Sequence, residues 1–118
     1  MKFTDTLKKN YEFHRLYSKG QSAVTPYLVV YARKTKKRTN RIGITVSTKL
    51  GKAVVRNRVR RRIREIYRLS EERFTPGTEI VVVARVRAVK ASYQQLEKAM
   101  LSACGKLGIL TGRGEVSR

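Results

Sequence analysis

Residues 49–68 read KLGKAVVRNRVRRRIREIYR, and this stretch decides how the chain folds. Its apolar side chains recur mostly at intervals of three and four residues, the spacing that places them on one side of an α-helix. They are Val55, Val59, Ile63, Ile66 and Tyr67. At about 100° per residue, they cover roughly 120° of the helix surface. The pattern predicts a helix from about residue 53 to residue 72 with one face packed in a core.

The opposite side of this helix is strongly basic. Nine of the residues in 49–68 are Lys or Arg, and only Glu65 is acidic. The side chains that spread over roughly 160° of that side are Asn57, Arg58, Arg61, Arg62, Arg64 and Arg68. The planar guanidinium group binds phosphate through two parallel hydrogen bonds and stacks on bases. The alternative is a solvated face with i,i+4 ion pairs, but such pairs require acids. The sequence therefore favours a phosphate-binding surface.

The whole chain shares this positive charge. Its 118 residues include 28 Lys and Arg but 8 Asp and Glu, which gives a net charge of +20. Such a surplus repels itself, whereas binding to a phosphate backbone neutralises it and releases condensed counterions. RNA, DNA and an acidic membrane surface are the candidate partners. Composition favours nucleic acid, because the chain has no Trp and no strongly hydrophobic amphipathic segment of the membrane-binding kind.

Composition also excludes several classes of protein. The hydrophobic fraction of 41% is enough to fill one core, so the chain is not disordered by composition. It lacks the apolar run of about 18 residues that a membrane-spanning helix needs. Residues 1–5 lack the apolar stretch of a signal peptide, and the single cysteine, Cys104, excludes an intrachain disulfide and a thiolate metal site. We expect a cytoplasmic protein.

Around the basic helix the sequence predicts a single α+β domain spanning residues 1–118. Apolar positions between Asn10 and Gly20 predict a first helix, and Ser92 with Gln95 has the spacing of a capping box that begins the last helix. Strands are expected at residues 22–25, 27–33, 41–48 and 80–84. We expect an ordered core over about residues 7–107 and a short loose tail over residues 108–118.

A second candidate site lies on the predicted sheet. Alternation places Tyr27, Val29, Tyr31 and Arg33 on one face of the first long strand, and Gly43, Thr45 and Ser47 on the polar face of the next. A sheet face that mixes aromatic, hydroxyl and cationic side chains often holds single-stranded nucleic acid. Phe13 and Tyr17 of the first helix are expected to line the same cleft. The alternative is that Phe13 and Tyr31 only pack beneath the first helix.

No catalytic site is predicted among the side chains. Phosphodiester hydrolysis by a protein uses clustered carboxylates with metal ions, or a pair of histidines. The acids are dispersed, and the adjacent Glu71 and Glu72 do not share one helix face. His14, the only histidine, is expected on the surface of the first helix, and Cys104 is expected in the core.

The segment Arg56–Arg64 resembles the signature R-N-R-x-x-R-x-x-R of the bacterial ribonuclease P protein subunit. Residues 13–20, 41–51 and 80–85 also resemble that family, so the likeness covers roughly residues 7–105. The resemblance implies three helices packed on a four-stranded mixed sheet, in the order αβββαβα, with a ribosomal-protein-S5-domain-2-like fold. It also implies a left-handed β-α-β crossover, where pattern reasoning alone predicts the usual right-handed one.

The resemblance implies a function as well. The family's protein joins a large catalytic RNA, and the complex removes the 5′ leader of precursor tRNA by metal-dependent hydrolysis. The RNA and its Mg²⁺ then carry the chemistry, with no organic cofactor. The implied partners are the catalytic ribonuclease P RNA and precursor tRNA, with no membrane and no protein partner required. This agrees with the lack of a predicted catalytic site.

The implied site residues fall on two surfaces. By resemblance, the surface that faces the RNA comprises Lys49, Lys52, Arg56, Asn57, Arg58, Arg60, Arg61, Arg62 and Arg64, to which the helix pattern adds Arg68. By resemblance, the leader-binding cleft comprises Phe13, Tyr17, Tyr31, Thr45 and Ser47, to which the strand pattern adds Arg33. A cationic turn is expected to contact RNA on charge alone; it comprises Lys36, Lys37 and Arg38. No residue is expected to bind a metal.

Two other functions remain open. A structural RNA-binding protein, such as a ribosomal protein without a part in catalysis, fits the charge and size equally well. The arginine signature and the aromatic cleft do not favour it. A membrane-active cationic helix is disfavoured, because the apolar face of residues 53–72 is committed to a core.

Overall fold

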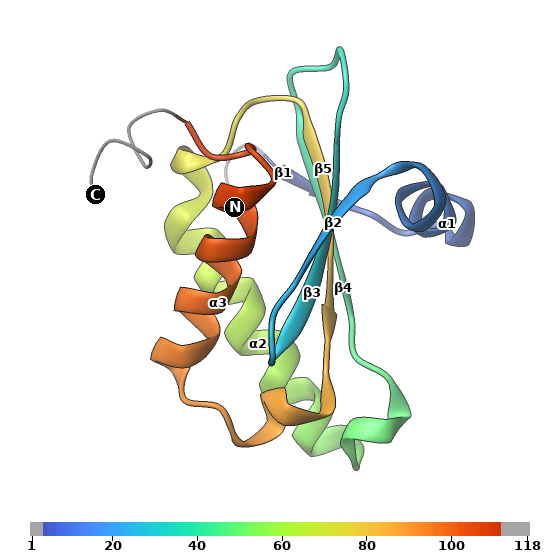
Figure 1. The fold of residues 1–118 in the computed structure, drawn as a ribbon. Helices are drawn as coiled ribbons and strands as arrows, with labels where there is room; N and C mark the ends of the chain where they lie inside the picture. The colour runs from blue at the N-terminus through green and yellow to red at the C-terminus, as the bar shows by residue number, and fades with distance from the viewer. Residues whose placement is uncertain (1–3, 112–118) are drawn as a thin grey trace.

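The computed structural model describes residues 4–111 and has three layers. The sheet lies in the middle, with α1 on one face and both α2 and α3 on the other (Figure 1). In chain order the elements are β1 (Thr4–Thr6), α1 (Asn10–Lys19), β2 (Gln21–Val24), β3 (Leu28–Lys34), β4 (Asn40–Thr45), α2 (Ala53–Ser70), β5 (Thr78–Ala84) and α3 (Tyr93–Lys106). Three short 3₁₀ helices lie between them: η1 (Thr48–Leu50), η2 (Glu71–Arg73) and η3 (Val86–Lys90).

The sheet is mixed, with the strand order β1-β4-β5-β3-β2. β4 is parallel to β1 and β5, whereas β3 is antiparallel to β5 and β2. The predicted α+β class with three helices is confirmed, but the sheet has five strands rather than four. The additional strand, β1, pairs with residues 40–42 at one edge. Its three polar side chains carry no alternating apolar pattern, so only the backbone pairing defines it.

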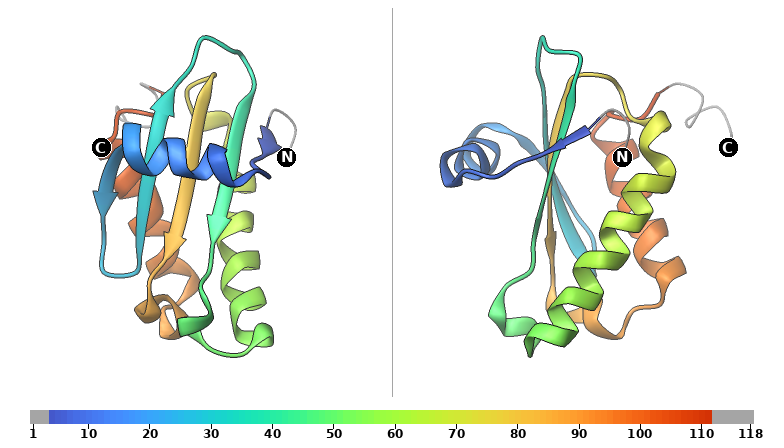
Figure 2. Two further views of the ribbon diagram at one scale, coloured as in Figure 1. Left: turned by 90° about the vertical axis from the view of Figure 1, so that its right-hand side faces the viewer. Right: turned by 180° about the vertical axis from the view of Figure 1, so that it is seen from behind.

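The connection between the two long parallel strands has the uncommon hand. In the left view of Figure 2, β4 and β5 both run downward, β5 lies to the left of β4, and α2 returns behind the sheet. This path is a left-handed crossover, as the family resemblance implies. It places α2 behind the β4 edge of the sheet, with α3 beside it.

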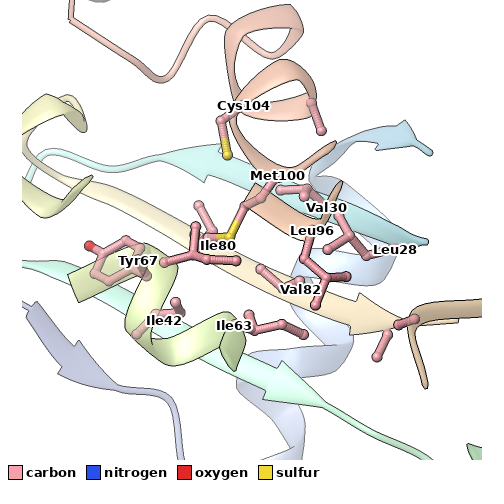
Figure 3. Packing of buried hydrophobic residues seen from close by; sticks show 14 of the residues in the cluster. Leu28, Val30, Ile42, Ile63, Tyr67, Ile80, Val82, Leu96, Met100 and Cys104 are labelled. Atoms are coloured by element: carbon pink, nitrogen blue, oxygen red, sulfur yellow. The ribbon is translucent and has the colours of Figure 1, made fainter. Parts of the chain in front are cut away.

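The main core fills the space between the sheet and the pair α2 and α3 (Figure 3). Its largest fully buried side chains include Leu28, Val30, Ile63, Ile66, Tyr67, Ile80, Val82, Leu96 and Met100. Cys104 is buried among them, as predicted, and this burial raises the pKa of its thiol to about 12. The thiol is therefore protonated at neutral pH and acts as a small apolar side chain.

The C-terminal segment is more ordered than predicted. The loose tail was expected to start at residue 108, but Ile109 and Leu110 are only 2% and 6% exposed. Leu110 forms a β-bridge with Phe74, and the amide of Thr75 donates to the carbonyl of Ile109 at 2.8 Å. These two apolar side chains close one end of the core, which keeps the backbone in place. The rest of the predicted tail, residues 112–118, lies outside the described residues.

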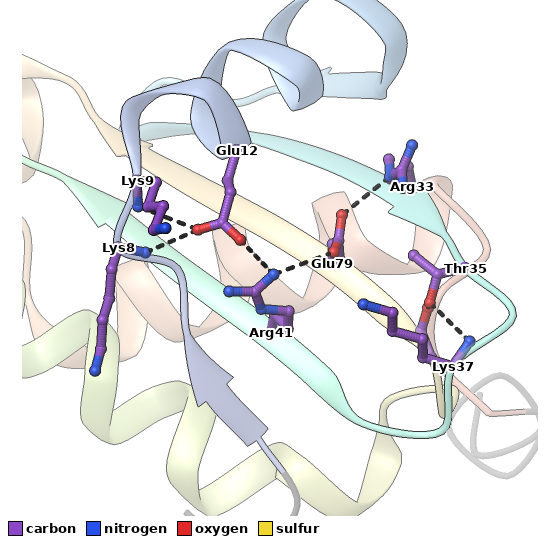
Figure 4. A network of polar contacts seen from close by, with 9 residues as sticks. Lys8, Lys9, Glu12, Arg33, Thr35, Lys37, Arg41 and Glu79 are labelled. Atoms are coloured by element: carbon purple, nitrogen blue, oxygen red, sulfur yellow. Dashed lines mark hydrogen bonds and ion pairs between the residues drawn. The ribbon is translucent and has the colours of Figure 1, made fainter.

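A chain of ion pairs fixes α1 to the sheet (Figure 4). Glu12 of α1 is buried and pairs with Arg41 of β4. Nη1 of Arg41 also lies 3.9 Å from Oε2 of Glu79 on β5, and Oε1 of Glu79 accepts a hydrogen bond from Nε of Arg33 at 3.0 Å. Both buried carboxylates therefore have guanidinium partners, so burial does not leave either charge uncompensated.

We expect Glu12→Gln to make the free energy of unfolding depend less on pH under acidic conditions. Hydrogen bonds from the amide of Lys9, then the amide of Lys8 and Arg41, lower the pKa of Glu12 below its ordinary 4.5 and outweigh the opposing effect of burial. A carboxylate with a depressed pKa stabilises the fold above the unfolded pKa, and this contribution is lost as pH falls through the folded pKa. Thermal melts of both proteins at a series of pH values below neutral measure the difference. Identical pH dependence would show that Glu12 contributes nothing.

Candidate RNA-binding surface

α2 has one buried and one exposed face, as the sequence predicts. Val59, Ile63, Ile66 and Tyr67 are buried against the sheet and α3. The helix is long enough to carry the arginines along the β4 side of the molecule. It begins after Lys52, has no acid in its first turn, and ends at Ser70, where η2 follows.

Three exposed guanidinium groups of α2 have no partner within the described residues. They belong to Arg58, Arg61 and Arg64, for which no hydrogen bond or ion pair to residues 4–111 is found. An unneutralised cation on an exposed helix face is available to a phosphate group. These three residues are therefore the strongest candidates for direct contact with RNA.

Other arginines of α2 also serve the fold. Nη1 of Arg62 donates to the carbonyl of Ala91 at 3.0 Å and so ties α2 to the segment before α3. Arg68 donates from Nε and Nη2 to the two carboxylate oxygens of Glu65, at 2.9 and 2.7 Å. The predicted face thus includes one arginine that anchors a neighbouring loop and one that is already paired.

The residues at the start of α2 make short-range contacts. Nε of Arg56 donates to the carbonyl of Gly51 at 3.1 Å, and Nη1 of Arg60 donates to Oδ1 of Asn57 at 3.1 Å. Lys49 and Lys52 are exposed, and Ser47 accepts a hydrogen bond from the amide of Lys49 at 3.3 Å. Ser47 thus caps η1 while its side chain stays at the surface beside the basic helix.

Four of the predicted cleft residues come together where α1 crosses the sheet. Phe13 lies so close to Gly43 that a Cβ atom there would be 2.6 Å from the ring. The rings of Tyr17 and Tyr31 meet edge-on with 4.9 Å between centroids, and the hydroxyl of Tyr17 lies 3.1 Å from that of Thr45. Phe13 and Tyr31 are half-buried and pack beneath α1 while keeping an accessible edge. Tyr17 is 37% exposed.

Arg33 does not join this group, contrary to its predicted place in the cleft. It pairs in register with Glu79 of β5, whereas Thr45 pairs with Val83, four residues farther along the same strand. α1 packs on the sheet between these two levels, at Val81. Alternation places Arg33 on the correct face, but it gives no information on where the helix crosses. The ion pair with Glu79 then holds Arg33 on the far side of α1.

A groove connects the aromatic cleft with the basic face of α2. β1 pairs only with residues 40–42, so residues 43–45 of β4 have no strand neighbour on that side. A cavity of about 110 Å³ at this edge is lined by Thr6, Leu7, Phe13, Ile42, Ile44, Arg60 and Arg64. Unpaired backbone groups at a strand edge donate and accept hydrogen bonds. The edge of β4 thus joins the two predicted surfaces into one.

A further basic patch was missed in the sequence. Arg87 and Lys90 of η3 are exposed and line a cavity of about 520 Å³ whose other walls include Tyr27 and Leu50. The available signal was a run of cations without any acid over residues 80–96. Its residues lie in a 3₁₀ helix rather than in a periodic element, so no pattern drew attention to them. The predicted cationic turn, residues 36–38, is exposed at the opposite end of the strands.

Four acidic side chains of the described residues make contacts within the fold. Besides the pairs of Glu12, Glu65 and Glu79, the carboxylate of Glu71 accepts a hydrogen bond from Thr4 at 2.6 Å. His14 is exposed on α1, as predicted. Over residues 4–111, no three His, Cys, Asp or Glu side chains lie together as a metal-binding group.

The helices of the described region are too short or too polar to cross a membrane.

Several known proteins are similar to this chain in sequence. The family model described as Ribonuclease P matches residues 1–108. The ribonuclease P protein component of Clostridioides difficile is 45% identical over 98 residues, which cover 82% of this chain and 86% of the relative. That of Alkaliphilus oremlandii is 39% identical, covering 93% of this chain and 96% of the relative.

Solved structures are similar to this chain in fold. The RNase P protein of Staphylococcus aureus superimposes with a TM-score of 0.82 at 33% identity, covering 90% of this chain and 97% of that one. The protein from Thermotoga maritima has a TM-score of 0.75 at 29% identity, covering 83% and 93%. The chain therefore belongs to the ribonuclease P protein family.

Proposed function

We propose that this chain binds the catalytic RNA of ribonuclease P through α2 and grips the 5′ leader of precursor tRNA beneath α1. The groove at the edge of β4 carries this proposal, because it links Phe13 of the cleft directly to Arg60 and Arg64 of the basic helix. A single strand that leaves the cleft along this edge meets aromatic rings first and guanidinium groups next. Such an order suits an RNA whose leader is held apart from its folded body.

The protein's part in leader removal is binding and positioning. Three of its buried or half-buried carboxylates, those of Glu12, Glu65 and Glu79, are held in ion pairs, and we assign no step of the hydrolysis to a side chain. We propose that the RNA subunit supplies the Mg²⁺ ions. The catalytic RNA and precursor tRNA are both polyanions and repel each other. The unpaired cations of α2 reduce this repulsion and hold the two RNAs close together.

This role implies a ribonucleoprotein of this chain, the catalytic RNA and precursor tRNA. The proposed compartment is the cytoplasm, where tRNA precursors are processed. No protein partner is needed for the proposed role, because both RNA-binding surfaces lie on one chain and meet at the edge of β4.

We expect Tyr17→Ala to weaken binding of leader-bearing precursor tRNA by about 1–3 kcal/mol, the usual cost of removing one stacking ring. Tyr31→Ala is expected to have a similar effect where the fold survives. The measurement is a titration of the protein–RNA complex with precursor tRNA and with leaderless tRNA. Tyr11→Ala is the matched control, because Tyr11 is 61% exposed on α1 and lies outside the cleft residues.

The comparison of leader-bearing with leaderless tRNA decides whether the cleft binds the leader. Equal losses for both tRNAs would contradict a leader cleft and leave only general RNA affinity. Since Tyr31 is half-buried against Leu7, Leu16 and Val81, unfolding of Tyr31→Ala would assign that ring to the core. In that case Tyr17→Ala still tests the cleft, because the ring of Tyr17 is more exposed.

A further inference from the structure

A cavity at the other edge of the sheet belongs to neither surface described above. It has a volume of about 330 Å³. It lies where the C-terminal end of α1, the C-terminal end of β3 and the residues that follow α3 meet. Its walls include Lys19, Arg33, Lys34, Leu107 and Ile109. In the left view of Figure 2, this edge is formed by β2 and β3, with the end of α1 in front and the end of α3 behind.

The cavity is positively charged without compensation from its own walls. Lys19 and Lys34 are exposed, and no acidic residue is among the residues that line it. The carboxylate that pairs with Arg33, that of Glu79, is also shared with Arg41. Its bond to Arg33 uses Nε, so the two terminal nitrogens of Arg33 have no partner over residues 4–111. A guanidinium group held in this way presents its remaining N–H groups in a fixed direction.

Besides the three cations, the cavity is lined by the polar side chain of Gln21 and by three apolar residues. The apolar residues are Ala32, Leu107 and Ile109, of which Leu107 is the half-buried one and presents the accessible apolar surface. The volume lies at the lower end of the range for small-ligand sites, about 300–1,000 Å³. A cavity lined by both cations and apolar side chains matches a phosphate group joined to a base.

This cavity is separate from the surface formed by the basic helix. The cavity reaches β3, which β5 separates from β4, so two strand spacings of about 4.8 Å put β3 roughly 10 Å from the edge behind which α2 lies. We propose that the cavity is a nucleotide-binding site, in which Lys19, Arg33 and Lys34 hold a phosphate and the apolar wall takes the base. The nucleotide comes either from a second segment of an RNA strand or from a free nucleotide.

The test is an NMR titration of the full chain with adenosine 5′-monophosphate, adenosine, inorganic phosphate and a short oligoadenylate. We expect the monophosphate to shift the amide signals of Lys19, Gly20, Gln21 and Lys34. Lys19→Ala/Lys34→Ala is expected to weaken this binding about tenfold or more, because it removes two of the three cations that hold the phosphate. Lys8→Ala/Lys98→Ala removes the same charge from exposed positions that line neither the cavity nor the RNA-binding surface, and it is expected to change the affinity by less than about twofold.

The ligands separate the parts of the proposal. Tighter binding of the oligoadenylate than of the monophosphate identifies an RNA strand as the source, and equal binding identifies a free nucleotide. Inorganic phosphate binding as well as the monophosphate would overturn the base site. Absence of shifts at these amides, or equal losses in both double variants, would overturn the whole site. None of these readouts depends on the leader cleft, so the proposed function stands or falls separately.

Discussion

Replacing Arg58, Arg61 and Arg64 together by alanine is expected to weaken binding to the catalytic RNA roughly a thousandfold at physiological salt. These three side chains are exposed and have no partner within residues 4–111, so their guanidinium groups are free to bind phosphate. Each charge-assisted hydrogen bond contributes about 1.5 kcal/mol or more, and about 1.4 kcal/mol corresponds to a factor of ten. Because none of the three packs in the core, the fold is expected to survive.

The dependence on salt distinguishes phosphate contacts from a general loss of charge. Each phosphate contact contributes about one unit to the slope of log K against log salt, so the triple variant is expected to lose about three units. Lysine at the same three positions retains the charge and is expected to keep the slope. Lys98→Ala, on the exposed face of α3, is the remote control. An unchanged slope in the alanine variant would identify these arginines as a solvated face.

Gly77→Ala is expected to destabilise the fold by about 2–5 kcal/mol. Gly77 has φ = +83°, in the left-handed region, which costs other residues about 1–2 kcal/mol. A Cβ atom there would also overlap the backbone carbonyl oxygen of Lys37. Forcing atoms into an occupied space costs about 1–3 kcal/mol. The carbonyl of Gly77 accepts from the amide of Thr35 at 2.7 Å, so the strain reaches the end of β3.

Thermal and urea unfolding measure this cost, which is expected to lower Tm by about 10 °C or more. Gly105→Ala is the matched control, because Gly105 lies in α3 and a Cβ atom there would meet nothing within 4 Å. Alanine is the better helix former by about 0.5–1 kcal/mol, so Gly105→Ala is expected to raise Tm. Equal stability of Gly77→Ala and the native protein would contradict the close approach of Gly77 to the backbone carbonyl of Lys37.

The elements that the sequence predicts well are those with strong local patterns. Four of the five apolar residues predicted for the stripe of α2 are buried, and Val55, near the start of the helix, is half-buried. The capping box of α3 is formed, with the hydroxyl of Ser92 accepting from the amide of Gln95 at 3.1 Å and the amide of Ser92 donating to the Gln95 side chain at 2.9 Å. In both places the physical cause acts within a few residues, so a short window of sequence contains it.

Features that depend on distant segments were not predictable in this way. β1 exists because residues 4–6 meet the edge of β4, and Leu110 is buried because Phe74 lies opposite it. The hand of the crossover came from the family resemblance, since local patterns favour the other hand.

The candidate site shows the same division. The face of α2 that carries arginine follows from helical spacing alone. The bond from Arg62 to Ala91 and the separation of Arg33 from Thr45 depend on where α3 and α1 lie against the rest of the protein. Alternation assigns a residue to a face of a sheet, but only the packed helix decides which parts of that face remain open.

The most direct test of the central claim is cleavage of a precursor tRNA with a 5′ leader at low Mg²⁺. The reaction is followed with the catalytic RNA alone, with this protein alone, and with both together. If the protein binds and positions while the RNA carries the chemistry, only the pair cleaves efficiently, and the protein alone is inactive. Cleavage by the protein alone would contradict the assignment of its carboxylates to the fold. An unchanged rate on adding the protein to the RNA would contradict its role as a working subunit.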